Sequence, residues 1–383
     1  MMKKMDWKIP LYKIYSDEED LNIVTNVIKR GERWAIGPEI EEFEDAIKNY
    51  IGTDYCATLN SGTSALHAIL LAYEIGNNHE VIVPSFSFIS TANSVLFVGS
   101  TPVFADIEPS TFGLNPADVK SKINSKTKAV IPMDYGGLSC KLSELKKITT
   151  ENKLILIEDA AESLGSSVYG EKVGSKSDSA MFSFCGNKVL TTGEGGAIVT
   201  NSKKIYEKIK LIRSHGRTDR INYFDNADDS DYVGLGYNWR MSSITAALGI
   251  SQMKKLDKII KMRQENAKFL SLHLSKIPQI RVPKPPKGHE HIYQMYTILL
   301  PNSEIRNNLH YFLSEKRIFS KVYFKPIHLT EYYKNISKKS FILPTTEEIS
   351  NQVLTLPIYP NMTSEEKNYL IDSITEFFEK QNF

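Results

Sequence analysis

Cysteine is scarce in this chain, with three residues among 383, and Cys56, Cys140 and Cys185 lie far apart. Their spacing fits neither a disulfide framework nor a zinc site, so we expect reduced thiols and no bound metal. Long apolar runs are also missing. No stretch of about 18 apolar residues occurs, and the first residues lack the apolar core of a signal peptide. The sequence therefore predicts a cytoplasmic protein without a membrane segment.

An excess of charge of either sign is absent as well. The 47 basic and 45 acidic residues are spread along the chain and leave a formal net charge of +2. Proteins that bind nucleic acids or acidic membranes usually have a basic patch, so we expect neither partner. What the chain does have is 41% hydrophobic residues, an ordinary share for a globular protein with a sizeable core.

Short apolar runs alternate with helical segments in the first part of the chain. The runs lie at residues 56–59, 81–83, 102–106, 129–132 and 154–157. This alternation predicts an α/β fold with a parallel sheet covered on both faces, and hairpin-like runs beyond Ser179 predict a mixed far side. Residues 241–274 read as one long helical tract, broken once. We expect a large domain over residues 1–255 and a smaller C-terminal α+β domain over residues 256–383.

Residues 60–66, Asn-Ser-Gly-Thr-Ser-Ala-Leu, follow a strand and open a helix. The free amides of Gly62, Thr63 and Ser64 would then form an anion site suited to a phosphate. A simple helix cap explains the same residues. The stretch has neither the Walker A spacing nor the GxGxxG pattern, which disfavours P-loop chemistry and an NAD-dependent oxidoreductase.

Three further side chains point to a planar cofactor. Asp159 ends the most apolar strand, where a carboxylate can hold a heterocyclic nitrogen protonated, although it could also cap a helix. Phe88 follows another strand and offers a ring for stacking, with core packing as the simpler interpretation. Lys188 lies on a loop between an apolar strand and the glycine-rich residues 193–196. A buried lysine there could be a nucleophile, but most loop lysines are solvated. Together these groups address the phosphate, ring, pyridinium nitrogen and aldehyde of pyridoxal 5′-phosphate.

At this point the chain resembles the sugar aminotransferases of the DegT/DnrJ/StrS type along nearly its whole length. The matching stretches are residues 60–66, 84–88, 158–162, 182–188, 191–196 and 354–360. The resemblance implies the aspartate aminotransferase-like fold type I of pyridoxal-phosphate enzymes. It also implies a homodimer with shared active sites.

The resemblance further implies roles for single residues. Lys188 would form the Schiff base with the cofactor, and Asp159 would pair with its pyridine nitrogen. Glu162 would lie near the ring hydroxyl, and Phe88 would stack on the ring. The phosphate would be held by Gly62, Thr63, Ser64 and Ser183, with Asn238 reaching it from the partner subunit. Trp34 and His328 stand where relatives shape the sugar-nucleotide pocket, but packing or surface roles explain both equally well.

The implied reaction is transamination, in which L-glutamate leaves as 2-oxoglutarate and the cofactor passes through its pyridoxamine 5′-phosphate form. Related dehydratases have histidine at the lysine position, so Lys188 favours amine transfer. Residues 191–196 resemble enzymes that act at C4 of the hexose, and Gly-Asn-Lys resembles GDP-perosamine synthases. A nucleotide-linked 4-keto-6-deoxy sugar is therefore the expected acceptor, in a pathway of glycan biosynthesis. A 3-keto sugar aminotransferase and a non-catalytic sugar-nucleotide-binding protein remain as alternatives.

Overall fold

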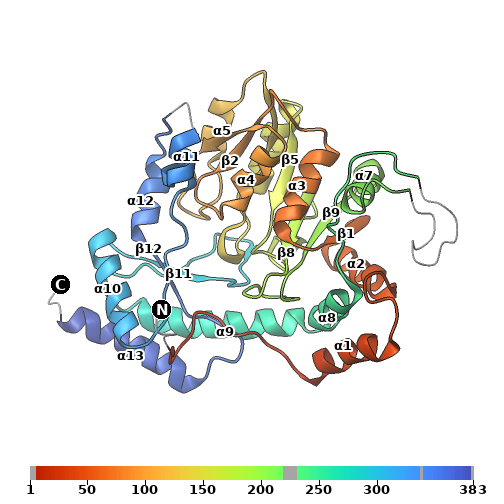
Figure 1. The fold of residues 1–383 in the computed structure, drawn as a ribbon. Coiled ribbons are helices and arrows are strands. Elements are labelled where there is room, and N and C mark those ends of the chain that lie inside the picture. The colour runs from red at the N-terminus through yellow and green to blue at the C-terminus, as the bar shows by residue number, and fades with distance from the viewer. Residues whose placement is uncertain (1–5, 219–230, 337–339, 381–383) are drawn as a thin grey trace.

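Seven strands form the central sheet of the protein (Figure 1). The computed structural model describes residues 6–218, 231–336 and 340–380. The sheet order is β1-β9-β8-β5-β4-β2-β3, and its strands are β1 (Tyr55–Leu59), β2 (Glu80–Pro84), β3 (Thr101–Ala105), β4 (Thr127–Val130), β5 (Ile155–Asp159), β8 (Ser179–Ser183) and β9 (Gly196–Thr200). Strand β9 is antiparallel to both neighbours, and the other adjacent pairs are parallel. The predicted mostly parallel sheet with a mixed far side is confirmed.

Helices cover both faces of this sheet. The helices α3 (Gly62–Ala72), α4 (Ser90–Phe97) and α7 (Lys203–Arg213) lie on one face, and α5 (Pro116–Lys122) and α6 (Leu142–Glu151) lie on the other. Successive side chains of a strand point to opposite faces. Ile157 of β5 therefore packs in the core with α3, α4 and α7, and Leu156 packs in the core with α5 and α6. Burial on both sides explains why the parallel strands are continuously apolar.

The long helical tract is broken once, as predicted. Lys255 caps the C-terminus of helix α8 (Ser243–Lys254), and α9 (Leu256–Leu274) begins directly after it. In Figure 1, α9 runs along the base of the molecule below the sheet. Its buried residues Ala267, Leu270 and Leu274 join the core of the C-terminal part.

The C-terminal part is built on a two-stranded sheet. It contains β11 (Tyr296–Leu299), α10 (Ser303–Glu315), α11 (Glu331–Ile336), α12 (Pro344–Gln352), β12 (Val353–Leu356) and α13 (Ser364–Lys380). Strands β11 and β12 pair antiparallel. Ile327, Tyr333 and Leu343 nevertheless pack into the core of the large sheet. The predicted boundary at 255/256 falls at the break between α8 and α9, and the division into two domains stays a prediction.

The described residues also form two N-terminal helices and a small three-stranded sheet. They are α1 (Glu18–Arg30), α2 (Pro38–Ile51), β6 (Ser167–Val168), β7 (Glu171–Lys172) and β10 (His289–Glu290). Strand β6 pairs antiparallel with both β10 and β7. The side chain of Phe43 on α2 packs with α8 and the strands β8 and β9 in one core cluster.

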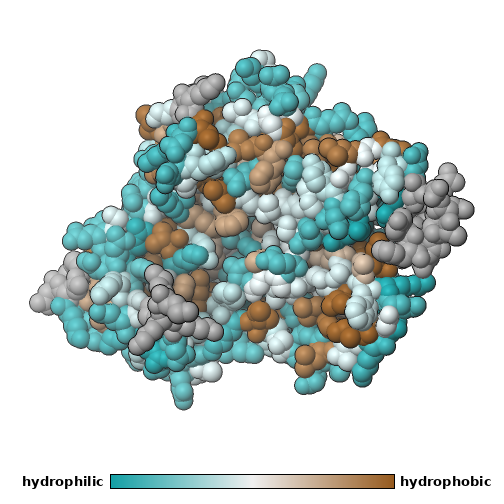
Figure 2. All heavy atoms as spheres, viewed as in Figure 1, coloured by the Kyte–Doolittle hydropathy of each residue, from teal (hydrophilic) through white to brown (hydrophobic). Residues whose placement is uncertain are grey.

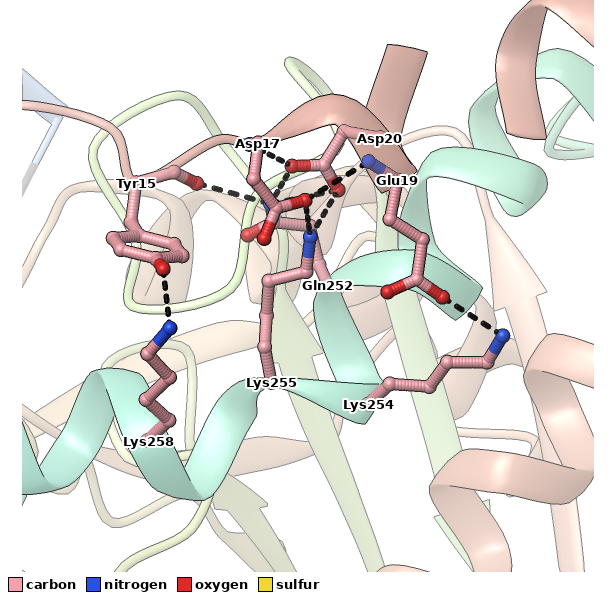
Figure 3. A network of polar contacts seen from close by, with 8 residues as sticks. All are labelled: Tyr15, Asp17, Glu19, Asp20, Gln252, Lys254, Lys255 and Lys258. Carbon is pink, nitrogen blue, oxygen red and sulfur yellow. Dashed lines mark hydrogen bonds and ion pairs between the residues drawn. The ribbon is translucent and has the colours of Figure 1, made fainter. Parts of the chain in front are cut away.

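The N-terminal segment runs across the molecule and is fixed at both ends. Ile9 forms a parallel bridge with Ile318 of the C-terminal part. At the other end the segment meets the junction of α8 and α9, where a polar network surrounds Lys255 (Figure 3). Lys255 lies 3.1 Å from Asp20 and also contacts Asp17. The remaining contacts are Gln252 to Tyr15 and Asp20, Lys254 to Glu19, and Lys258 to the Tyr15 hydroxyl. Residues 9–20 therefore hold the two parts of the chain together.

The surface is polar over most of the face shown in Figure 2, with separate apolar patches. Large apolar side chains that are exposed in this chain include Ile14, Leu21, Ile28, Trp34, Tyr232, Val233 and Leu235. Leu235 is the most exposed of these side chains, with 85% of its surface accessible. None of the described helices combines the length and the apolar character that crossing a bilayer requires.

Candidate active site

The carboxyl ends of β2, β5 and β8 meet at one edge of the sheet. This is the edge at which open α/β sheets bind their ligands. Asp159 is the last residue of β5, Ser183 is the last residue of β8, and Phe88 follows β2 by four residues. The parallel order β2-β4-β5-β8 therefore gathers residues that are up to 95 positions apart in the sequence, from Phe88 to Ser183.

Asp159 is almost wholly buried, with 3% of its surface exposed. Its Oδ2 accepts a hydrogen bond from the Thr91 hydroxyl at 2.7 Å, and its Oδ1 accepts one from the Ala161 amide at 3.3 Å. Burial raises the pKa of Asp159 from 3.8 to about 6, while the two hydrogen bonds and the charge of Lys188 act to lower it. A cationic partner beside this carboxylate would counteract the rise in its pKa and keep the group ionised.

Lys188 points into the same site. Its side chain is 14% exposed, and Nζ lies 3.4 Å from Glu162 Oε1. The other oxygen of Glu162 accepts the Gly136 amide at 2.9 Å. The loop itself is held by Gln294, whose Nε2 donates to the Asn187 carbonyl at 2.7 Å. Lys188 is thus neither solvated nor free, which overturns the simpler expectation for a loop lysine.

The N-terminal segment closes the side of the site behind Lys188. Tyr12 and Lys13 line a small cavity together with Asn187 and Lys188. Arg263 of α9 lines the same cavity. The segment that the polar network of Figure 3 fixes to α8 and α9 therefore forms a wall next to the lysine.

The N-terminus of α3 presents free backbone donors where the sequence predicts the anion site. Ser61 caps the helix by accepting the Ser64 amide at 3.1 Å, and Ala65 donates the first intrahelical bond. The amides of Gly62 and Thr63 come before that bond, where helical backbone donors have no partner within the helix. A side chain on Gly62 would meet Ser183 Cβ at 3.0 Å, a tight contact, so glycine favours the close approach of α3 to β8.

A largely buried ion pair holds the strand that leads into this helix N-terminus. Glu44 of α2 accepts hydrogen bonds from the amide and the hydroxyl of Thr58, at 2.8 and 2.9 Å. Arg213 of α7 donates to Glu44 at 2.5 Å and to the Thr58 carbonyl at 2.7 Å. The pair joins α2, β1 and α7 just before the chain turns into the anion site at Asn60.

Phe88 completes a set that fits pyridoxal 5′-phosphate. Its ring is 58% exposed although its neighbours Ser87 and Thr91 are buried, so a face is free for a planar group. The amides of α3 suit a phosphate, and the buried Asp159 suits a protonated ring nitrogen. Lys188 supplies an amine for an aldehyde. The donor types present therefore match each part of the cofactor.

Three further predicted residues have their own surroundings in the structure. The main chain of Asn238 is bridged to Ser214, and its carbonyl lies 3.5 Å from Nδ2 of Asn60, so the residue borders the anion site of its own chain. Trp34 is 47% exposed and donates its indole N–H to the Val27 carbonyl.

His328 is buried between two side chains. Its Nδ1 lies 2.6 Å from the Ser85 hydroxyl, and its Nε2 lies 3.3 Å from Glu347. These contacts tie the segment after residue 326 to the end of β2. They fit the packing role that the sequence left open, and a role of His328 in the sugar-nucleotide pocket stays a prediction.

Sequence reasoning missed several residues that shape this site. Thr91, Gly136 and Gln294 all contact predicted site residues or their loop. Thr91 lies one helical turn after Ser87, in the helix that the sequence predicts after Phe88. Its place near the site could therefore have been predicted. Gly136 and Gln294 come from segments that only the folded chain brings to the site.

Fold and site together define a class of protein. A mostly parallel sheet with a buried lysine, a buried carboxylate, an exposed ring and a helix N-terminus at one edge is the arrangement of pyridoxal-phosphate enzymes of fold type I. Residues 15–375 match the DegT/DnrJ/EryC1/StrS aminotransferase family, and the chain belongs to this family. It is an aminotransferase, and aminotransferases work with pyridoxal 5′-phosphate. The predicted family, fold and cofactor are confirmed.

Similar proteins extend over the whole chain. GDP-perosamine synthase of Vibrio cholerae is 32% identical over 372 residues, which cover 97% of this chain and 99% of that protein. Helicobacter pylori PseC, an aminotransferase involved in the biosynthesis of pseudoaminic acid, has a TM-score of 0.92 at 28% identity, covering 97% of this chain and 99% of that one. Spr1654 of Streptococcus pneumoniae in its PLP-form has a TM-score of 0.91 at 26% identity, with 97% and 99% covered.

Proposed function

We propose that this aminotransferase transfers the amine of L-glutamate to a nucleotide-linked 4-keto-6-deoxy sugar, as one step of glycan biosynthesis in the cytoplasm. The observation that supports the proposal most is that the largely buried Lys188, which pairs with Glu162, lies at the same sheet edge as the buried Asp159, whose pKa its charge acts to lower. Similarity to a GDP-perosamine synthase over the full chain supports the sugar substrate. The Gly-Asn-Lys form of the lysine loop supports the same choice.

Each side chain would have a separate role in the reaction. When bound, the cofactor supplies an electron sink for the charge that develops on the substrate carbon. Lys188 would take a proton from that carbon and return it as a general base and acid. Asp159 would hold the proton on the ring nitrogen. Glu162, 3.4 Å from Lys188, would orient the amine, and Phe88 would keep the ring in plane while excluding water from one face.

Two subunits would share each site in this proposal. The residues before Asn238 expose Tyr232, Val233 and Leu235, and exposed apolar side chains in one short segment favour contact with another protein surface. A second copy of the chain is the partner that the family resemblance implies. Asn238 would then act on the phosphate of the neighbouring subunit.

Mixing two inactive variants tests the shared site. Lys188→Ala and Asn238→Ala subunits would each lack one essential group. A heterodimer of the two contains one complete site, so co-expressed or refolded mixtures should regain activity. Equal mixtures that stay as inactive as either parent would show that Asn238 serves its own chain.

The reaction is tested with purified protein, L-glutamate and a panel of GDP-, dTDP- and UDP-linked 4-keto and 3-keto sugars. We expect 2-oxoglutarate with a 4-keto-6-deoxy sugar, and NMR of the product should place the amine at C4. Amination at C3 would favour the 3-keto alternative. Absence of both 2-oxoglutarate and covalently bound cofactor would favour the non-catalytic one.

The role of the lysine is tested by borohydride reduction, which fixes the cofactor to the amine that holds it. Lys188→Ala should lose the reduced adduct and the activity. Lys176→Ala is the matched control, because this lysine is 57% exposed and pairs with Glu171 on the surface. An adduct that persists in Lys188→Ala would disprove the assignment.

A further inference from the structure

Two buried carboxyl groups lie behind the strand end that bears Asp159. Glu158 precedes Asp159 in β5, so its side chain points to the opposite face of the sheet, toward α5 and α6. Asp134 follows β4 on that face. Both Glu158 and Asp134 have no exposed surface. Neither is among the residues assigned above to the cofactor or the substrate.

The hydrogen bonds of this pair leave one oxygen on each group. Glu158 Oε2 accepts from the Gly174 amide at 2.9 Å and the Ser177 hydroxyl at 3.0 Å. Asp134 Oδ1 accepts from the Cys140 amide at 2.8 Å. Glu158 Oε1 and Asp134 Oδ2 have no donor among the described residues, and each carboxyl group influences the pKa of the other. Two buried neighbouring carboxylates repel each other and neither can donate, so a proton on one of them would satisfy both free oxygens.

The surroundings decide which group has the proton. Burial raises the pKa of Asp134 to about 6, and Asp159 also acts to raise it. Burial and the neighbouring Asp134 raise the pKa of Glu158 well above its usual value. The stronger rise at Glu158 makes it the expected donor of such a hydrogen bond, with Asp134 as the acceptor.

The pair is linked to Lys188 by a short chain of contacts. The Asp134 amide donates to the Asp159 carbonyl at 3.0 Å, and Asp134 begins the turn that contains Gly136. The Gly136 amide donates to Glu162 Oε2 at 2.9 Å, and Glu162 Oε1 lies 3.4 Å from Lys188 Nζ. Any shift of Asp134 would therefore move the donor that orients Glu162.

We propose that Glu158 is protonated in the resting enzyme, that it donates a hydrogen bond to Asp134, and that this acid pair positions the Gly136 turn, Glu162 and Lys188. Glu158 and Asp134 are positioning residues, because they act through the turn and touch no substrate. The neutral acid also prevents a further negative charge beside Asp159, which has to ionise for its own role. The part of the proposal that involves Lys188 rests on the proposed function, and the protonation of Glu158 does not.

Infrared spectroscopy of the cofactor-free protein in D2O at pH 8 tests the proton directly. Surface carboxylates, Asp134 and Asp159 are ionised at this pH, so a protonated carboxyl stretch should come from Glu158. Labelling glutamate with ¹³C at its side-chain carboxyl should shift the band, and Glu158→Gln should abolish it. A wild-type protein without such a band would overturn the proposal. This measurement needs no substrate, so it stands apart from any failure of the proposed reaction.

Substitutions test the positioning. Glu158→Leu leaves Asp134 Oδ2 without a donor, and we expect kcat to fall about tenfold or more, with the KM for L-glutamate changed less than threefold. In Glu158→Gln the amide can donate to Asp134, so kcat should recover most of that loss. Equal kcat values for the Leu and Gln variants would contradict the positioning role.

A second single variant keeps this test valid if Glu158→Leu does not fold. In Asp134→Asn, Oδ1 can still accept the Cys140 amide while Nδ2 donates to Glu158 Oε1, so a hydrogen bond persists without a proton on Glu158. We expect this variant to keep at least a third of the wild-type kcat and to lack the infrared band. A loss of more than tenfold in a protein that melts like the wild type would show that the hydrogen bond does not position the turn.

Discussion

The Thr91 hydroxyl lies 2.7 Å from Asp159 Oδ2 and donates a hydrogen bond to it, although the two residues are 68 positions apart. Thr91 belongs to α4, and Asp159 ends β5. The bond acts against the burial that raises the pKa of Asp159 to about 6. A helix packed on the sheet thus helps to keep the carboxylate ionised, which its predicted role requires.

Replacing Thr91 should therefore change the pH dependence of the enzyme. Thr91→Val removes the hydrogen bond but keeps the shape, so the pKa of Asp159 should rise. A hydrogen bond to a charged group contributes about 1.5–3 kcal/mol, which corresponds to roughly one to two pH units. The acid limb of the profile of kcat/KM should move up by about that amount. Thr91→Ser retains the hydroxyl and should leave the limb in place; equal profiles for Val and Ser would contradict the explanation.

The stability of the cofactor-free protein should depend on Asp159 in a defined pH range. The folded pKa of about 6 exceeds the ordinary value of 3.8, so the folded state keeps its proton where the unfolded state has lost it. The unfolding free energy should fall as pH rises from about 4 to 6, by about 3 kcal/mol from this group. Asp159→Asn should lack this component. Denaturant unfolding of both proteins across the range gives the difference, and parallel curves would refute the prediction.

Gly62 should tolerate no side chain without loss of cofactor affinity. An added Cβ would lie 3.0 Å from Ser183 Cβ and 3.1 Å from Met181 Sδ, so α3 would have to move away from β8. Overpacking of this kind costs about 1–3 kcal/mol, and we expect Gly62→Ala to bind pyridoxal 5′-phosphate about tenfold more weakly. Gly76→Ala is the control, because its Cβ would meet only the Val98 carbonyl at 3.6 Å. Fluorescence titration of the cofactor-free proteins measures both affinities.

The ion pair below the anion site should contribute strongly to stability. Arg213→Met would leave Glu44 buried without its cation, and breaking a buried pair in this way costs about 3–5 kcal/mol. The unfolding free energy should fall accordingly. Lys203→Met removes an exposed charge from the same helix and should change it by less than about 0.5 kcal/mol. Similar values for the two variants would mean that the Glu44–Arg213 contact is not retained in solution.

The local sequence determined much of the candidate site. Asp159, Phe88 and the first turn of α3 follow strands whose apolar runs could be recognised, and the carboxyl ends of parallel strands share one edge. Hydrophobic periodicity and the residues that start helices are local properties, so the alternation of elements and the break near residue 255 could be read directly.

The tertiary structure decided how these groups act. Segments that are distant in the sequence bury most of the Lys188 side chain and bring it to Glu162. They also place His328 between Ser85 and Glu347. Gly136, Gln294 and the Glu158–Asp134 pair had no local signal, because their partners come from other elements. Residue types and strand ends are written in the sequence, whereas burial, and with it the charge state of each acid, exists only after the chain has folded.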